Sequence, residues 1–221
     1  APVPLREEVL VEVKKFSGFQ FLAPGLIVYG IIIMISQVIG MVTEIRKRRY
    51  HFRYFTSKTT AWEIVLGTAL SLMPLALVQV LLLFGTAQLL GFDASTNLVS
   101  ALVVAVPTVL FVVGMGILIA TLVKDSQAAE GMGTMVGIVL GFFSGSFIQV
   151  PEVAVRIAGT SFDIMQIVPT RLATNAMTNV LLYDRSLISV WQSVAWLSGV
   201  AILLFLLSAV AYQRVQFRTI D

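Results

Sequence analysis

The 221-residue sequence contains no cysteine and only one histidine, His51. Without thiols the chain can form neither disulfide bonds nor thiolate metal sites, and a lone histidine cannot build a metal site. The sequence also lacks the G-x-x-x-x-G-K-[ST], HExxH and GxSxG motifs. We therefore expect no P-loop nucleotide binding and no enzymatic activity in this chain, and no cofactor bound to it.

Charged residues are also scarce, at 12% of the chain, which is about half the share of about 25% found in soluble domains. Hydrophobic residues make up 57%. A helix needs roughly 20 apolar residues to cross hydrocarbon about 30 Å thick. Five stretches meet or approach that length without an internal charge: 22–42, 64–90, 98–122, 131–148 and 190–212. The sequence therefore predicts an all-α polytopic membrane protein with five transmembrane helices.

The distribution of Lys and Arg predicts the orientation of these helices. With the N-terminus outside, the segments 43–63, 123–130 and 213–221 face the cytoplasm and carry nine Lys and Arg residues. The outer segments carry six, spread over many more residues. Because Lys and Arg concentrate in cytoplasmic loops, we expect an outer N-terminus and a cytoplasmic C-terminus. Residues 1–20 alternate like a strand but fit a helix nearly as well, and we expect them to end a truncated extracytoplasmic segment.

The segment 43–63 holds six of the fifteen Lys and Arg residues, interleaved with aromatic residues. One interpretation is a basic anchor on anionic lipid, where each Lys or Arg contributes about 1 kcal/mol. Another is a structured elbow that docks on a cytoplasmic partner. We do not expect nucleic-acid binding, because no soluble domain remains outside the spans. Ser57 or Thr60 is placed to cap the following helix, with Glu63 at capping-box spacing from Thr60, and Trp62 occupies an aromatic-belt position.

The stretch 131–148 carries a glycine at every fourth position: Gly133, Gly137, Gly141 and Gly145. In lipid, small residues at this spacing allow two helix backbones to approach closely. The pattern fits packing within the chain, and it also fits a subunit interface or the wall of a translocation path. Gln37 and Gln79 lie deepest among the polar residues of the spans, where we expect them to hydrogen-bond between helices.

Residues 149–189 are too long for a simple turn, and neither of the two helical candidates within them is long enough to cross the bilayer. Pro151 opens and Gly159 closes a first short helical candidate. A second begins near Pro169, because proline suits the first turn of a helix. We therefore predict two short helices that dip into the outer leaflet or lie on it.

Five stretches, in this order and spacing, resemble the type-2 permease subunits of ATP-binding-cassette (ABC) exporters: FLAPGLIVYGIIIM, TEIRKRRYHFRYFTSKTTAWEIVLGTAL, ATLVKDSQAAEGMGTMVG, FFSGSFIQVPEV and IVPTRLATNAM. The similarity runs over nearly all of residues 21–212. Members of that family have six spans, so this chain would supply spans two to six, and residues 21–221 would form the transmembrane domain. It departs from the family at YHFRYF, where a glycine is common.

The resemblance implies a permease of the plasma or inner membrane that works as a homodimer or heterodimer with two cytoplasmic ABC ATPase subunits. ATP and Mg would bind to those ATPases, and membrane lipids would surround the spans. It also implies roles for individual residues. Coupling to the ATPase would involve Glu44, Arg46, Arg53, Tyr54, Phe55, Thr56, Ser57, Lys58 and Trp62. The translocation path or subunit interface would include Gln37, Gly133, Gly137, Gly141 and Gly145, and the outer gate Pro151, Pro169 and Arg171. A non-transporting scaffold that recruits a partner or anionic lipid through the basic elbow is the alternative.

Overall fold

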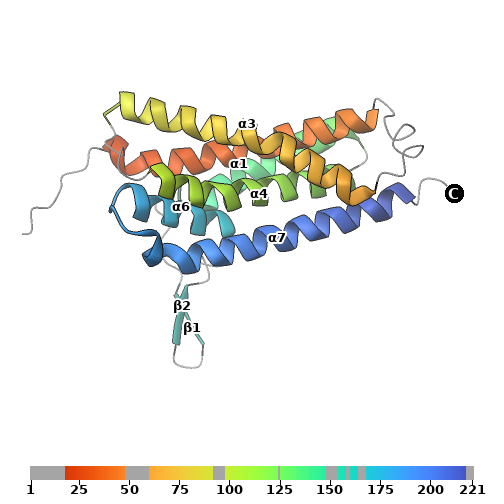
Figure 1. Ribbon diagram of the computed structural model, residues 1–221. Helices are drawn as coiled ribbons and strands as arrows, with labels where there is room; N and C mark the ends of the chain where they lie inside the picture. The colour runs from red at the N-terminus through yellow and green to blue at the C-terminus, as the bar shows by residue number, and fades with distance from the viewer. Residues whose placement is uncertain are drawn as a thin grey trace, which may run out of the picture.

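The computed structural model describes residues 18–47, 60–91, 98–123, 125–147, 154–157, 160–163 and 168–217. This part of the chain forms a bundle of six helices with one two-stranded hairpin (Figure 1). The helices are α1 (Gly18–Lys47), α3 (Ala61–Leu89), α4 (Leu98–Leu122), α5 (Ser126–Phe143), α6 (Pro169–Leu181) and α7 (Leu187–Phe217). The strands β1 (Ala154–Ile157) and β2 (Thr160–Asp163) pair antiparallel.

Four of the described helices are long and apolar enough to cross a membrane, over Phe19–Ile45, Val65–Leu89, Leu98–Leu122 and Leu187–Arg214. The predictions for 22–42, 64–90, 98–122 and 190–212 are thereby confirmed as long apolar helices. Each of α1, α3 and α4 includes one internal proline. The chain is therefore a multi-pass membrane protein by the length and composition of these helices.

The helix predicted at 131–148 is shifted in the structure and is not one of these four candidate spans. Helix α5 begins five residues earlier, at Ser126, and ends at Phe143. Its 18 residues correspond to about 27 Å of helix. The chain then turns through Ser144–Phe147, with Gly145 at φ 76°. A residue with positive φ cannot continue a right-handed helix, so the glycine repeat does not extend the helix to Gly145 as its spacing suggests.

Helices α1 and α3, which follow one another among the described helices, run in opposite directions. Gln20, in the first turn of α1, donates a hydrogen bond to the carbonyl of Gly91, directly after α3. We call this side of the bundle the Gln20 end. At the opposite side, the first turn of α3 meets the second half of α7 (Figure 1). We call that side the Trp62 end, and α1, α4 and α7 all finish there.

Helices α1 and α4 form the centre of the bundle. Buried residues make up 56% of the apolar window in α1 and 61% of that in α4, against 33% in α3 and 28% in α7. Helix α1 contacts α3, α4, α5 and α6, whereas α7 packs mainly against α4. The outward faces of α3 and α7 are rich in exposed Leu, Val and Trp. Such surfaces are expected where lipid rather than water surrounds the protein.

The segment between α5 and α7 differs from the prediction of two short helices. The first predicted helix, from Pro151 to Gly159, is wrong: Ala154–Ile157 is strand β1, paired with β2 in the register Val155 to Phe162. Both strands alternate β-branched or aromatic residues with others, and this pattern favours a hairpin over a helix. The second predicted helix is confirmed as α6, which has Pro169 in its first turn. The hairpin projects away from the bundle (Figure 1).

Candidate functional site

The described residues predicted to couple to a partner gather at the Trp62 end of the bundle. Glu44 is exposed near the end of α1, and the backbone of Arg46 continues the same helix. Trp62 lies in the first turn of α3. The remaining predicted coupling residues lie outside the described residues: Arg53, Tyr54, Phe55, Thr56, Ser57 and Lys58.

Helix α3 begins with the capping box that the sequence predicts. The hydroxyl of Thr60 accepts a hydrogen bond from the backbone N–H of Glu63 at 3.4 Å, and the Glu63 carboxylate accepts one from the N–H of Thr60 at 2.8 Å. These two bonds satisfy donors that the start of a helix would otherwise leave without partners. The cap thus fixes where α3 begins.

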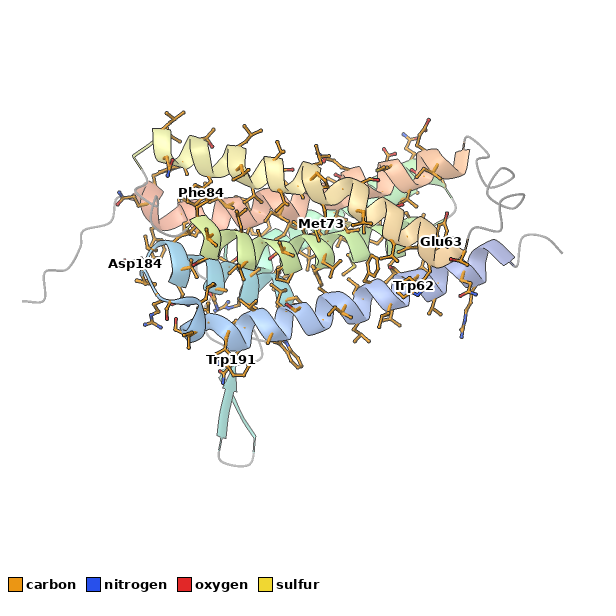
Figure 2. All side chains as sticks on the ribbon, in the orientation of Figure 1. Trp62, Glu63, Met73, Phe84, Asp184 and Trp191 are labelled. Atoms are coloured by element: carbon orange, nitrogen blue, oxygen red, sulfur yellow. The ribbon has the colours of Figure 1, made fainter. Side chains whose placement is uncertain are left out.

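The indole of Trp62 connects this helix start to α7. Its ring stacks on the ring of Phe205, with centroids 5.8 Å apart and an interplanar angle of 29°. Figure 2 shows Trp62 between the first turn of α3 and α7. Phe205 in turn lies tightly against α4, because its backbone N is 3.2 Å from where a Cβ on Gly114 would sit. Trp62 therefore joins α3 to α7, and Gly114 allows α7 to approach α4 closely.

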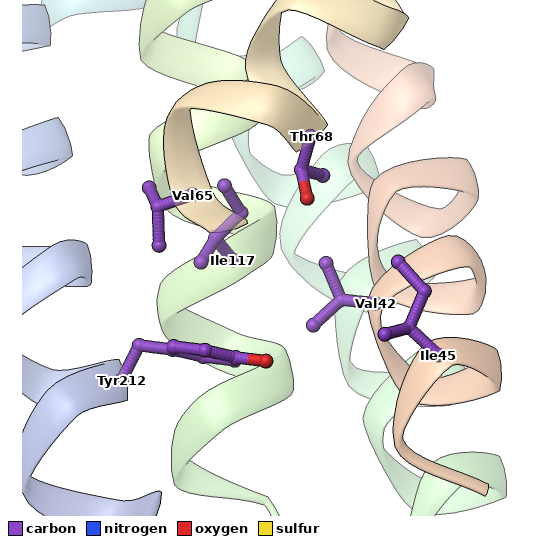
Figure 3. A pocket seen from close by; sticks show the side chains of 6 residues that line it. All are labelled: Val42, Ile45, Val65, Thr68, Ile117 and Tyr212. Atoms are coloured by element: carbon purple, nitrogen blue, oxygen red, sulfur yellow. The ribbon is translucent and has the colours of Figure 1, made fainter. Parts of the chain in front are cut away.

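A second contact at this end brings four helices around one small cavity (Figure 3). It is lined by Val42 and Ile45 of α1, Val65 and Thr68 of α3, Ile117 of α4 and Tyr212 of α7. Its volume is about 10 Å³, close to the minimum needed for one water molecule. The Tyr212 hydroxyl points across the cavity toward α1 (Figure 3). The two helices that flank residues 48–59 thus meet α4 and α7 at one junction.

Three of the four predicted glycines form a seam between α5 and α1. A Cβ on Gly133 would meet the Ile39 side chain, and one on Gly141 would meet the Tyr29 ring. A Cβ on Gly137 would come within 3.7 Å of the Ile32 carbonyl oxygen. These glycines therefore let α5 pack directly against α1 of the same chain, one of the two interpretations of the pattern. Gly145 lies in the turn after α5 instead.

Beyond Gly141, the contact between α1 and the turn after α5 depends on Gly25, which the sequence pattern did not indicate. A Cβ on Gly25 would stand 2.7 Å from the carbonyl oxygen of Ser146 and 2.8 Å from its Cα. The hydroxyls of Ser144 and Ser146 are buried and lie 2.6 Å apart. Gly25 precedes the regular glycine repeat and lies in another helix, so spacing alone gives no signal of this contact.

The two glutamines of the spans lie in different surroundings. Gln79 donates a hydrogen bond of 2.7 Å to the carbonyl of Gly30, so the expected bond between helices is confirmed for this residue. Gln37 is exposed on the face of α1, where the side chains of Ile33 and Met41 are also exposed. Gln37 is therefore a polar residue on a face that borders the α1–α5 seam.

Two of the three predicted outer-gate residues are described. Pro169 begins α6, and Arg171 follows within its first turn, with only 9% of its surface exposed. Neighbouring Thr170 is fully buried and donates a hydrogen bond of 3.3 Å to the Leu140 carbonyl of α5. Pro151 lies outside the described residues. Helix α6 thus sits among α1, α4, α5 and α7 rather than on the surface.

Comparison with protein-family models agrees with this arrangement of apolar helices. The model of the ABC-2 family transporter protein matches residues 2–210. The chain belongs to this family, whose members are the membrane-embedded permease subunits of ABC transporters. The curated proteins and the solved structures compared with the chain include no match.

Proposed function

We propose that the chain is the permease subunit of an ATP-driven exporter, which works as a dimer with two separate cytoplasmic ATPase subunits. Membership of the ABC-2 family supports the permease role. The observation that carries the coupling mechanism is the contact of Trp62 with Phe205. Trp62 lies at the end of the proposed elbow, so a force on the elbow would reach α7 through this aromatic pair.

The coupling would act at the Trp62 end, on the cytoplasmic side of the plasma or inner membrane. Closure of the ATPases on ATP and Mg would displace the elbow, which belongs to the segment 43–63 in which α1 ends and α3 begins. Both helices line the junction around Tyr212, together with α4 and α7. The ATPases would shift the permease between two states by binding one of them more tightly.

The translocation path would run beside α1 and α5. We propose that α5 is a fifth helix that crosses the membrane. Gln37 is exposed on this side of α1. The glycine seam would hold α1 and α5 together while they move as one unit. The segment with Pro151, Pro169 and Arg171 would close the outer end of the path. A buried arginine is costly and so commonly marks a functional position in membrane proteins.

Replacing the elbow tests the proposed coupling. In one variant a Gly/Ser linker of equal length replaces Tyr54–Lys58, and in the control such a linker replaces Asp93–Asn97, which lie between α3 and α4 in the sequence. We expect the first variant to insert normally but to lose co-purification with the ATPase, and the control to retain it. Retained binding in the first variant would contradict the proposal. ATP hydrolysis that stays the same with and without the permease would favour the scaffold alternative.

A further inference from the structure

A cleft at the Trp62 end opens between the start of α3 and the last turns of α7. Its volume is about 380 Å³, and it is lined by Thr60, Trp62, Leu206, Ala209, Val210 and Gln213. Volumes of about 300–1,000 Å³ are typical of small-molecule sites. We propose that this cleft binds one anionic phospholipid, with an acyl chain beside Leu206 and the phosphate near Gln213 and Arg214.

The cleft changes from apolar to polar along its length, as a phospholipid does. Leu206 and Val210 are exposed apolar residues, whereas Gln213 and Thr60 offer an amide and a hydroxyl. From Leu206 to Gln213 the helix rises about 10 Å, enough to pass from hydrocarbon to headgroup. Arg214 ends the candidate span of α7, and Trp62 stands just before that of α3. The polar end therefore lies at the depth where headgroups lie.

The charge near the polar end favours an anionic headgroup. Arg214 lies one turn beyond Val210 on α7 and is exposed. The acidic group nearest to Thr60 in the sequence is the carboxylate of Glu63. This carboxylate belongs to the cap of α3, where it accepts a hydrogen bond from the Thr60 N–H. Lys or Arg at the membrane surface attracts anionic lipids. A zwitterionic lipid would fill the same apolar groove without gaining this attraction.

Fluorescence quenching of Trp62 can test the site in the full-length chain. The chain has three tryptophans, so Trp191→Phe with Trp196→Phe leaves Trp62 as the only indole. The matched reference carries Trp62→Phe and Trp191→Phe, so Trp196 is its only indole. Trp196 is 55% exposed on α7, away from the cleft. Both proteins are reconstituted in phosphatidylcholine vesicles containing a minor fraction of phosphatidylglycerol with brominated acyl chains, because bromine quenches nearby indoles.

We expect Trp62 to be quenched more than the mole fraction of brominated lipid predicts, with a preference of about fivefold for the anionic lipid, as one cation at the membrane surface provides. Quenching of Trp196 should follow the mole fraction of the brominated lipid. Arg214→Gln and Val210→Phe, both at exposed positions, should each remove the excess quenching of Trp62. The control Leu203→Phe, outside the cleft, should leave this excess unchanged. Quenching of Trp62 that follows the mole fraction, or an excess that survives both cleft variants, would overturn the proposal. The readout does not depend on ATPase binding, so it can fail independently of the transport function.

Discussion

The ring of Trp62 stacks on that of Phe205, with centroids 5.8 Å apart, although the two residues belong to the second and the last of the long apolar helices. This contact joins the end of the proposed elbow to α7, and Gly114 places α4 directly behind Phe205. Trp62 therefore connects the start of α3 to helices that lie far from it in the sequence. The contact predicts effects on both stability and coupling.

The stability effect can be measured with a double-mutant cycle of Trp62→Ala and Phe205→Ala. Aromatic pairs contribute about 0.5–1.5 kcal/mol beyond their buried area, so we expect a coupling energy of that size in the free energy of unfolding in mixed micelles. Trp196→Ala with Phe205→Ala is the control and should be additive to within about 0.5 kcal/mol. Additivity in the Trp62 cycle would show that the stack contributes nothing to stability.

The effect on coupling concerns ATP hydrolysis by the partner ATPase. If Trp62 transmits elbow movement to α7, Trp62→Ala and Phe205→Ala should each change the stimulated hydrolysis rate without preventing ATPase binding. The control is Trp191→Ala, because Trp191 lies near the start of α7 at the opposite end of the bundle (Figure 2). The measurement is ATP turnover in proteoliposomes. A stimulated rate equal to that of the unmodified chain in both variants would exclude this route.

The capping box predicts a local effect at the start of α3. Thr60→Ala removes the side-chain acceptor for the Glu63 N–H, and loss of such a cap typically costs about 0.5–2 kcal/mol. We expect faster amide hydrogen exchange in the first turn of α3 and a lower free energy of unfolding. Thr86→Ala, at an exposed threonine near the end of the same helix, should have little effect on either. Equal effects of the two substitutions would contradict the assignment.

The seam between α1 and α5 predicts unequal effects of alanine at two glycines. Gly25→Ala would force a Cβ to within 2.8 Å of the Ser146 backbone, and overpacking of this kind typically costs about 1–3 kcal/mol. Gly131→Ala meets no atom within 4 Å and should be neutral, or stabilising by up to about 1 kcal/mol. The free energies of unfolding of the two variants provide the test. Similar values for both would show that Gly25 does not determine the packing.

Much of the helical framework could be predicted from the sequence because long uninterrupted apolar runs have few alternatives in a membrane. The run 98–122 coincides with α4, and the spacing of Thr60 and Glu63 correctly predicts a capping box. Local signals of this kind need no knowledge of the neighbouring helices. They failed at Gly145, where a regular repeat continues past the end of its helix, and at the hairpin, where Val155 and Phe162 pair across strands.

The contacts of the candidate site were less predictable because they join residues distant in the sequence. Trp62 was singled out for its position in an aromatic belt, but nothing in its neighbourhood indicates Phe205 as its partner. Tyr212 and Gly25 were missed for the same reason, since each acquires its role only when α7 or the turn after α5 packs against it. The glycine repeat indicated close packing without identifying α1 as the partner helix.

The central claim is that a cytoplasmic ATPase acts on the permease through the elbow, and photocrosslinking in intact cells tests it most directly. A photoreactive amino acid replaces Phe55 in one variant and Tyr183, between α6 and α7, in the other. Crosslinked proteins are then identified by mass spectrometry. The account predicts a crosslink from position 55 to a P-loop ATPase and none from position 183. A crosslink to that ATPase from position 183, with none from position 55, would contradict it.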